Sequence, residues 1–226
     1  MLLAVERSSS AASAAVFAAD GSACLAFVEA SGAGAGDAWP LVRDALAAAG
    51  VSPADLDAFA VGVGPGSFSG IRSALALAQG LALPAGAPVR GVCSPAAALF
   101  RRRRENPDAP PARVVGDARR GHVWCVDEPA DFLSLSHTAA DVKLFSAGGA
   151  DPALPDAAAL FSDGRALLCA DPARLAPLFA AHGAAAPEPA APTARDVAAL
   201  CFAGSSGPAA PVYLHPAVAG PVPSAV

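Results

Sequence analysis

The sequence predicts an α/β protein of two lobes, each built on a mixed β-sheet that is flanked by helices. Within residues 1–104, three apolar stretches in hairpin order are followed by alternating helix and strand patterns. This order implies a mixed sheet with helices on both faces. A proline-rich stretch at 105–112 separates this unit from a weaker series of elements. Apolar residues make up 54% of the chain, which is ample for a core.

Local signals place the elements of the first lobe. The pattern at 2–6 predicts a buried strand, and Asp20-Gly21 between two apolar runs predicts a hairpin. Ser52 and Asp55 have the spacing of a capping box. A helix is expected before them, and the residues that delimit it are Asp37, Pro40 and Gly50. The remaining elements are expected as strands at 58–63 and 89–93 and as helices at 69–81 and 94–104.

The second lobe, at 113–226, is expected to be a smaller, degenerate copy of the first, after a hinge at 105–112. A hairpin that turns at 119–121 opens it, and helices are expected near 173–181 and 193–203. The C-terminal tail is expected to return to the first lobe.

The charge balance argues against a broad basic face that would hold a nucleic-acid backbone unaided. The formal net charge is −5, and only 15% of the residues are charged. The apolar start of the chain is too short for a signal peptide, and prolines break the apolar region at 74–89. We therefore expect a soluble, cytoplasmic protein without a membrane partner.

The cysteines and histidines show no pattern of a known site. The five cysteines are scattered and form no C-x-x-C pair, so buried, reduced thiols are expected. The four histidines form neither an H-x-x-x-H nor an H-E-x-x-H pair, which predicts no metal site. Because no Ser/His/Asp order indicates a triad, no catalytic residue is assigned.

The stretch GVGPGSFSGIRSALALAQGLA, at 62–82, raises the main functional question. It lacks the lysine of a P-loop, and Ser69 stands where the dinucleotide fingerprint needs glycine. Two interpretations remain open. Backbone N–H groups at the helix start can hold an anion, or Gly64-Pro65-Gly66 forms a tight turn with glycine at positive φ.

Two helical stripes are candidates for a partner interface. Ala74, Ala78 and Gly80 leave one face of the helix at 69–81 nearly bare, which allows another helix to approach closely. The residues assigned to this interface are Leu41, Val42, Leu46, Ile71, Ala74, Leu75 and Ala78. The alternative is that both stripes face the chain's own sheet.

Three segments together resemble the TsaB (YeaZ-like) family. They are GPGSFSGIRSALALAQGLA at 64–82, DARRGHVWCV at 117–126 and PVYLHPAV at 211–218, in the family's order. The resemblance implies a two-lobe actin-like, ribonuclease-H-like (ASKHA) fold, related to TsaD and glycoprotease-like proteins. It also implies a non-catalytic scaffold and dimerisation subunit of the complex that installs threonylcarbamoyl on adenosine 37 of tRNA.

The same resemblance implies the partners. A TsaD-like paralogue carries the metal and transfers the threonylcarbamoyl group, a TsaE-like ATPase joins the complex, and tRNA binds only through the complex. This chain is then expected to hold no cofactor, because ATP and metal belong to the partner subunits. The family pairs through the first two helices of its N-terminal lobe, and a homodimer is the alternative use of that surface.

Two departures from related proteins affect the expected sites. Superfamily kinases end the first strand with a magnesium-binding aspartate, whereas this chain has Glu6 followed by Arg7. The stretch SGAGAGDAW at 31–39 replaces the histidine-serine pair that usually enters the first long helix. The residues that remain as weak candidates for cofactor or phosphate binding are Glu6, Ser8, Ser9, Gly64, Gly66 and Ser67.

Two charged segments each allow a structural and a functional interpretation. The run from Arg101 to Arg104 is either a solvated helix end or a contact to the tRNA backbone. Asp117 with Arg119 and Arg120 is either a remnant phosphate hairpin or a structural turn. The role of the whole chain also stays open at this point, since it could be an active actin-fold kinase or ATPase or, third, a peptidase-like protein instead of a scaffold.

Overall fold

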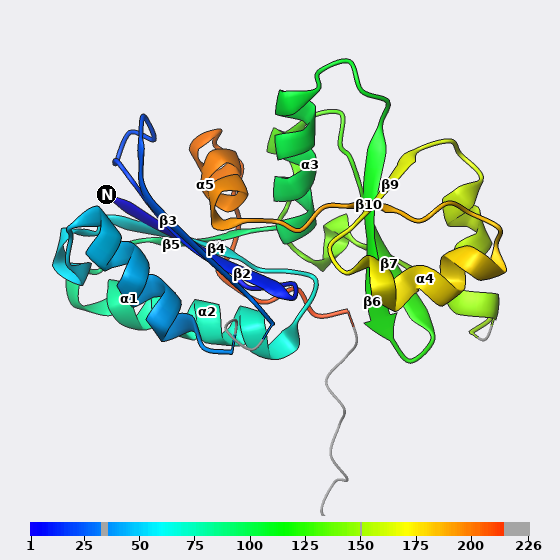
Figure 1. Cartoon of the computed structure of the whole chain (residues 1–226), viewed down its shortest axis with the longest axis horizontal. Helices are drawn as coiled ribbons and strands as arrows, with labels where there is room; N and C mark the ends of the chain where they lie inside the picture. The colour runs from blue at the N-terminus through cyan, green and yellow to red at the C-terminus, as the bar shows by residue number, and fades with distance from the viewer. Residues whose placement is uncertain (33–35, 150, 215–226) are drawn as a thin grey trace, which may run out of the picture.

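The computed structural model describes residues 1–32, 36–149 and 151–214, which form two β-sheets with helices around them (Figure 1). The strands of the first sheet are β1 (Leu2–Glu6), β2 (Ala11–Phe17), β3 (Cys24–Ser31), β4 (Ala58–Gly62) and β5 (Val89–Val92). Those of the second are β6 (Ala112–Arg119), β7 (His122–Asp127), β8 (Lys143–Ser146), β9 (Ala166–Cys169) and β10 (Glu188–Pro189). The α-helices are α1 (Ala38–Ala49), α2 (Phe68–Ala82), α3 (Ser94–Glu105), α4 (Pro172–Ala181) and α5 (Ala194–Phe202).

The two sheets share one topology. The strand order is β3-β2-β1-β4-β5 in the first sheet and β8-β7-β6-β9-β10 in the second. In each sheet the first three strands pair antiparallel, and the other two extend it in parallel. The second sheet therefore repeats the first, which confirms the predicted two-lobe α/β fold with mixed sheets.

Helices cover both faces of the first sheet, with α1 and α2 on one face and α5 on the other (Figure 1). Successive side chains of a strand point to opposite faces. In β1, Leu3 and Val5 accordingly belong to the core under α1 and α2, whereas Leu2 and Ala4 belong to the core on the opposite face. The central strand is thus apolar on both sides, as its sequence predicts.

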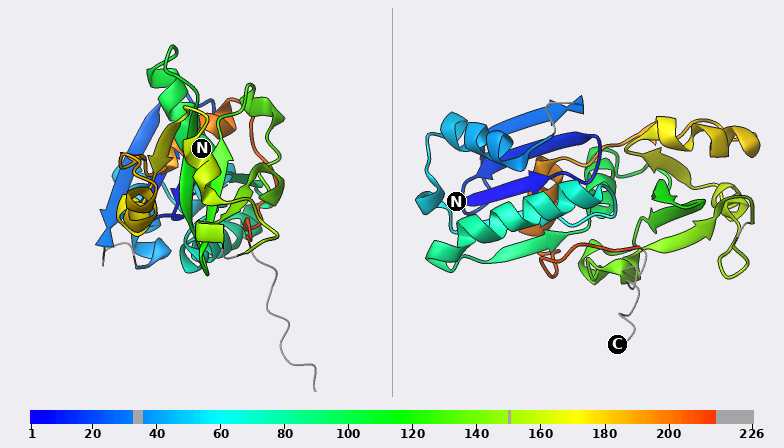
Figure 2. Two further views of the ribbon diagram at one scale, coloured as in Figure 1. Left: turned by 90° about the vertical axis from the view of Figure 1, so that its right-hand side faces the viewer. Right: turned by 90° about the horizontal axis from the view of Figure 1, so that it is seen from below.

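The chain returns to the first lobe after β10. The sequence predicts this return for the C-terminal tail, and in the structure it begins with α5, which packs on β1, β2 and β4. Residues 203–214, here called the C-terminal strap, then run along the first lobe to its junction with the second (Figure 2). Gly207 and Gly91 exchange backbone hydrogen bonds of 3.0 and 2.8 Å, and the Val212 N–H donates to the Val63 carbonyl at 2.9 Å.

The predicted two-residue turn at Asp20-Gly21 is longer than expected. β2 and β3 are joined by residues 18–23, closed by a hydrogen bond from the Ala18 N–H to the Ala23 carbonyl at 3.0 Å. Only Gly21 has a positive φ, of 74°, whereas a two-residue type I′ turn needs two such residues. Asp20 instead accepts the Ser22 N–H at 3.0 Å, and this local bond favours the wider loop.

Arginines of α3 fasten the hinge and α5. Arg101 pairs with Asp196 of α5 at 2.6 Å, and Arg103 pairs with the buried carboxylate of Glu128 at 2.6 Å. Arg102 and Arg103 also each donate to a hinge carbonyl at 2.9 Å. These three arginines are therefore only partly solvated, because each donates to a partner within the chain, whereas Arg104 is exposed. The contact to tRNA stays untested.

Four of the five cysteines are buried thiols, as expected, but Cys24 is exposed. Cys24 begins β3, the edge strand of its sheet, where one side has no neighbouring strand. Burial raises the pKa of Cys93 to about 12, which keeps that thiol protonated. In the part of the chain that the structure describes, no helix combines the length and apolar character needed to cross a bilayer.

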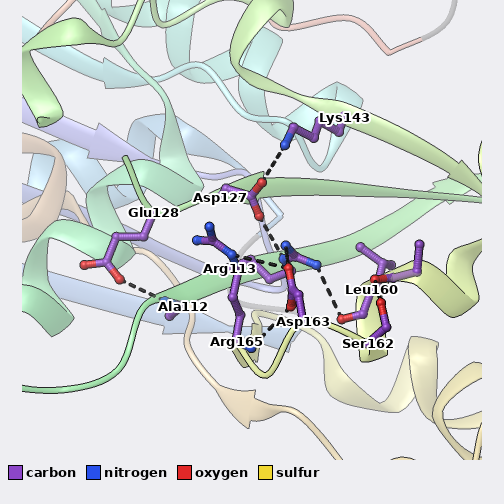
Figure 3. Close-up of polar contacts among 10 residues, drawn as sticks. Ala112, Arg113, Asp127, Glu128, Lys143, Leu160, Ser162, Asp163 and Arg165 are labelled. Carbon is purple, nitrogen blue, oxygen red and sulfur yellow. Dashed lines mark hydrogen bonds and ion pairs between the residues drawn. The ribbon is translucent and has the colours of Figure 1, made fainter. Parts of the chain in front are cut away.

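A partly buried ion-pair network holds the second sheet (Figure 3). Arg113 of β6 is 6% exposed and lies between Asp127 of β7, at 2.8 Å, and Asp163. Lys143 of β8 pairs with the second oxygen of Asp127 at 2.7 Å. Burial alone would raise the pKa of Asp127, but the hydrogen bond from Lys143 and the charge of Arg113 outweigh it and lower the pKa. The network thus connects β6, β7 and β8 with the loop that contains Asp163.

We predict that Arg113→Ala lowers the free energy of unfolding by about 3 kcal/mol, because it leaves two carboxylates without their buried partner. Lys143→Ala is the matched control in the same network. The Lys143 side chain is 65% exposed, so its loss should cost less than about 1 kcal/mol. Urea denaturation of both variants measures the difference, and equal losses would contradict the central position of Arg113.

Candidate functional site: the cleft between the lobes

Three segments far apart in the sequence meet at one cleft of about 930 Å³ between the lobes. The start of α2 contributes residues within 65–72, the β6–β7 hairpin contributes 114–120, and the end of the strap contributes 211–214. Residues 8–10, which follow β1, complete the wall of the first lobe. The three motif-bearing parts of the sequence therefore line a single site.

The glycine-rich turn packs against the end of β1. A Cβ on Gly66 would lie 2.0 Å from the carbonyl oxygen of Ser8, and one on Gly70 would lie 2.1 Å from that of Arg7. No side chain fits at either position, because both neighbours are backbone atoms. The glycines thus serve a close approach of two backbones, and the partner in this approach is the segment directly after the chain's own first strand rather than a second helix.

The same turn also caps α2. Gly64 has a φ of 87°, in the left-handed region that favours glycine. Ser67 caps the helix, since its hydroxyl accepts the Gly70 N–H at 3.3 Å, and the Ser67 N–H donates to the Ser8 carbonyl at 2.7 Å. These amides are bonded within the chain and are not offered to an anion, which favours the structural interpretation of the turn.

Glu6 ends β1, but its carboxyl is fully buried. One oxygen accepts the Ser8 N–H, and the other lies where a Cβ on Gly62 would come within 1.8 Å. Burial raises the pKa of Glu6 above its ordinary value of 4.5, against the lowering effect of hydrogen bonds from Ser8 and Ser94. The carboxyl belongs to the packing between β1, β4 and α3, and Glu6 does not line the cleft.

The serines after β1 line the cleft, and their hydroxyls have partners within the chain. Ser9 donates to the Ala11 carbonyl at 3.0 Å and accepts the Ala11 N–H at 3.3 Å. Ser10 donates to Asp171, just before α4, and so bridges the two lobes. Among the residues that the structure describes, no three His, Cys, Asp or Glu side chains gather in a way that suits a metal ion.

The β6–β7 hairpin forms the wall of the second lobe. Arg119, Arg120 and Gly121 all have positive φ, of 67°, 54° and 75°, which is uncommon for arginine. Asp117 accepts the Arg119 N–H at 2.8 Å and pairs with the Arg119 guanidinium at 3.2 Å. These local bonds confirm that Asp117 bonds to nearby backbone in a structural turn, and the turn projects two arginines at the cleft.

An exposed aromatic cluster at the cleft could not be foreseen from the sequence. The Arg72 guanidinium lies 3.8 Å from the centre of the Phe68 ring, and Arg72 Nε donates to the Tyr213 hydroxyl at 2.8 Å. Phe68 and Tyr213 are 58% and 44% exposed. Both rings lie within motifs that stand out in the sequence, but no local pattern indicates that segments 141 residues apart touch.

The seven residues assigned to a partner interface are buried inside the chain, each at most 5% exposed. They form part of the core between the first sheet and the two helices α1 and α2. The assignment is corrected accordingly: these stripes face the chain's own sheet, because an apolar stripe buries itself against the nearest apolar layer. The outward faces of the two helices carry other residues, which include the small residues Ala47, Ala48, Ala76 and Gly80 as well as Arg43, Asp44 and Gln79.

Comparison with known sequences identifies one family. The family model described as TsaD, tRNA N6-adenosine threonylcarbamoyltransferase, matches residues 30–152. The TsaB protein of Escherichia coli K12 is 38% identical over 98 residues, which are 43% of this chain and 42% of that relative. An uncharacterized protein of Mycobacterium tuberculosis is 34% identical over 182 residues, which are 78% of this chain and 72% of that relative.

Comparison with solved structures supports the same family. A Pseudomonas aeruginosa protein described as similar to the peptidase YeaZ has a TM-score of 0.65 at 25% identity. The alignment covers 95% of this chain and 99% of that one. YeaZ from Pseudomonas aeruginosa has a TM-score of 0.60 at 25% identity, over 94% of this chain and 99% of that one.

We predict that Glu6→Gln gains stability relative to the wild type as the pH rises above 4.5. Because the folded pKa is raised, the stability that Glu6 contributes is present below 4.5 and is lost as the pH rises through the folded pKa. The amide of Gln does not titrate. The difference in the free energy of unfolding between Glu6→Gln and the wild type should therefore grow by about 1.4 kcal/mol per pH unit between pH 4.5 and the folded pKa of Glu6. Urea denaturation of both proteins between pH 4.5 and 8 measures it, and a difference independent of pH would show an ionised Glu6.

We also predict that Ala78→Arg melts many degrees below the wild type. Ala78 is 1% exposed, and an unpaired charge there costs several kcal/mol. Ala76→Arg is the control on the outward side of the same helix, and it should change the melting temperature little. Circular dichroism melting compares the two, and an unchanged melting temperature for Ala78→Arg would refute the burial of this face.

Proposed function

The chain belongs to the TsaD family, as a TsaB/YeaZ-like member, and on this premise we propose that it takes part in threonylcarbamoyladenosine modification of tRNA. Its role in this proposal is a non-catalytic scaffold subunit, in the cytoplasm, beside a TsaD-like paralogue that performs the transfer. A TsaE-like ATPase joins the complex, and tRNA is reached through it. The observation that carries the proposal is the family match over 30–152, which spans α1, α2 and segments of both cleft walls.

The chemistry of the cleft supports the non-catalytic part of this proposal. Glu6 stands at the end of β1, where a metal-binding carboxylate would be needed, but it is buried and its pKa is raised. The N–H groups of Ser67 and Gly70, at the start of α2, are bonded to Ser8 and to Ser67 respectively. Both features count against an active kinase or ATPase, and in our proposal ATP and metal are held by the partner subunits.

We place the partner surface on the outward faces of α1 and α2. Small residues lie there, with Ala47 and Ala48 on α1 and Ala76 and Gly80 on α2, beside longer side chains such as Arg43 and Gln79. The backbone of another helix can come close at the small positions. Trp39 and Phe68, 44% and 58% exposed, lie in the first turns of these two helices. Aromatic side chains are enriched in interfaces, which supports this choice of face.

The test is co-purification with the TsaD-like paralogue encoded in the same genome. Ala76→Arg should weaken the complex by about a hundredfold or more, because a buried charge must lose its water. Ala173→Arg, on exposed α4 of the second lobe, is the matched control and should bind like the wild type. Wild-type affinity of a folded Ala76→Arg variant would remove α2 from the interface.

An activity assay distinguishes a non-catalytic subunit from an enzyme. The purified chain alone should transfer no threonylcarbamoyl group to tRNA, and adding it to the paralogue and the ATPase should restore modification. Transfer by this chain alone would contradict the non-catalytic role.

A further inference from the structure

His137 lies where three parts of the chain meet: the start of α3, the connection between β7 and β8, and the C-terminal strap. The side chain is buried, with the residue 1% exposed. Its Nδ1 accepts the Cys93 N–H at 3.0 Å, and its Nε2 lies 2.8 Å from the Ser205 hydroxyl. Ser205 in turn donates to the Phe132 carbonyl at 2.6 Å. The imidazole thus links both lobes and the strap.

The partners fix the tautomer of this ring. A backbone N–H only donates, so Nδ1 carries a lone pair and Nε2 carries the proton. Nε2–H therefore donates to Ser205, whose own proton points to Phe132. These directions also exclude His137 and Ser205 as a base and nucleophile pair, because Nε2 has no lone pair to receive the serine proton.

The backbone around the ring is tightly packed. His137 has a φ of 56°, a left-handed conformation that is uncommon for histidine. A Cβ on Gly207 of the strap would lie 2.5 Å from the Ser136 carbonyl oxygen, and one on Gly91 would lie 2.1 Å from that of Pro208. The backbone of the strap is therefore in close contact with both lobes where it passes between them. His137 hydrogen-bonds to Ser205 of the strap at this crossing.

The strap carries Tyr213, whose side chain lines the cleft. Beyond the crossing, Val212 is hydrogen-bonded to Val63 at 2.9 Å, and the next residue, Tyr213, accepts the bond from Arg72. The aromatic cluster of Phe68, Arg72 and Tyr213 is thus complete only while the strap lies along the first lobe.

We propose that His137 is an acid-sensitive lock that holds the C-terminal strap on the first lobe and so positions Tyr213 at the cleft. Protonation adds a hydrogen to Nδ1, which then faces the Cys93 N–H, and two donors cannot bond. The imidazolium loses this bond to the first lobe, keeps its Nε2–H bond to Ser205 of the strap, and is left as a charge in a buried place. When the charged ring leaves this place, it carries Ser205 away from the first lobe, which frees the strap and with it Tyr213.

The charged groups around the His137 ring offer little to stabilise its protonated form. Asp141 is the charged group that favours the imidazolium, yet its carboxylate is already bonded to Ser136 and Thr138. On the α3 side the Cys93 thiol is neutral, since burial raises its pKa to about 12, and burial likewise raises the pKa of the Glu6 carboxyl. The strap, at 203–214, contains no Asp, Glu, Lys, Arg or His.

Burial lowers the pKa of His137 more than Asp141 raises it. The stability that the lock supplies is therefore complete above the ordinary histidine value of 6.5 and is lost as the pH falls through the folded pKa. The lock is closed at neutral pH and opens in acid.

Hydrogen exchange of the full chain tests the lock through the amides of Gly207 and Val212. Protection, corrected for the intrinsic exchange rate, should fall by about tenfold or more between pH 7.5 and pH 5 in the wild type. In His137→Asn, an amide oxygen can accept the Cys93 N–H, and asparagine tolerates positive φ but does not titrate. Strap protection in this variant should not depend on pH. His182→Asn, at the end of α4, is the matched control and should keep the wild-type pH dependence.

Equal strap protection of the wild type at both pH values would overturn the proposal, and so would an unchanged pH dependence in His137→Asn. Ser205→Ala provides a second variant should His137→Asn fail to fold. It removes one bond of the ring and leaves the histidine in place, so strap protection at pH 7.5 should fall several-fold while β1 and β4 stay protected. Unchanged strap protection in Ser205→Ala would equally refute the lock.

Discussion

The burial of the first half of α3 on every side is the constraint on which both lobes depend. Residues 94–99 are all buried, and Ala96, Ala97 and Leu99 share one core with Leu2 of the first sheet and with Val114 and Leu168 of the second. The three alanines at 96–98 make this possible, since small side chains let one helix touch layers on several sides. The relative position of the lobes is therefore set by shared packing, and the hinge arginines reinforce it.

The cleft follows from this arrangement. Once α3 fixes the two sheets, the end of β1 and the start of α2 face the β6–β7 hairpin, and the strap closes the site from the side. The glycines at 66 and 70 bring the start of α2 into direct backbone contact with the residues that follow β1, so no side chain fits between these two segments of the wall.

Two buried titratable groups near the start of α3 act in opposite directions. Glu6 is favoured in its protonated form and His137 in its neutral form, and burial is the main cause of both shifts. Glu6 therefore adds stability in acid and loses it as the pH rises, whereas His137 adds stability at neutral pH and loses it in acid. Burial thus disfavours the charged form of both groups at the junction of the lobes.

The sequence alone determined the local structure. The Asp37 cap, the Ser52–Asp55 capping box and the turn at 119–121 all appear where their residues predict them, because such signals act over a few neighbouring residues. The order of strands and helices, and with it the topology of the first sheet, follows from the same short-range patterns.

Only the tertiary structure decided which way the helices face and which charges are buried. The stripe with Ala74 and Ala78 has the same period whether it meets its own sheet or a partner, so the sequence could not choose between them. In the sequence, Glu6 and Arg103 are candidates for external contacts and His137 belongs to no motif, yet each is bonded within the chain. Their roles depend on partners from distant segments, and only folding the whole chain brings those partners together.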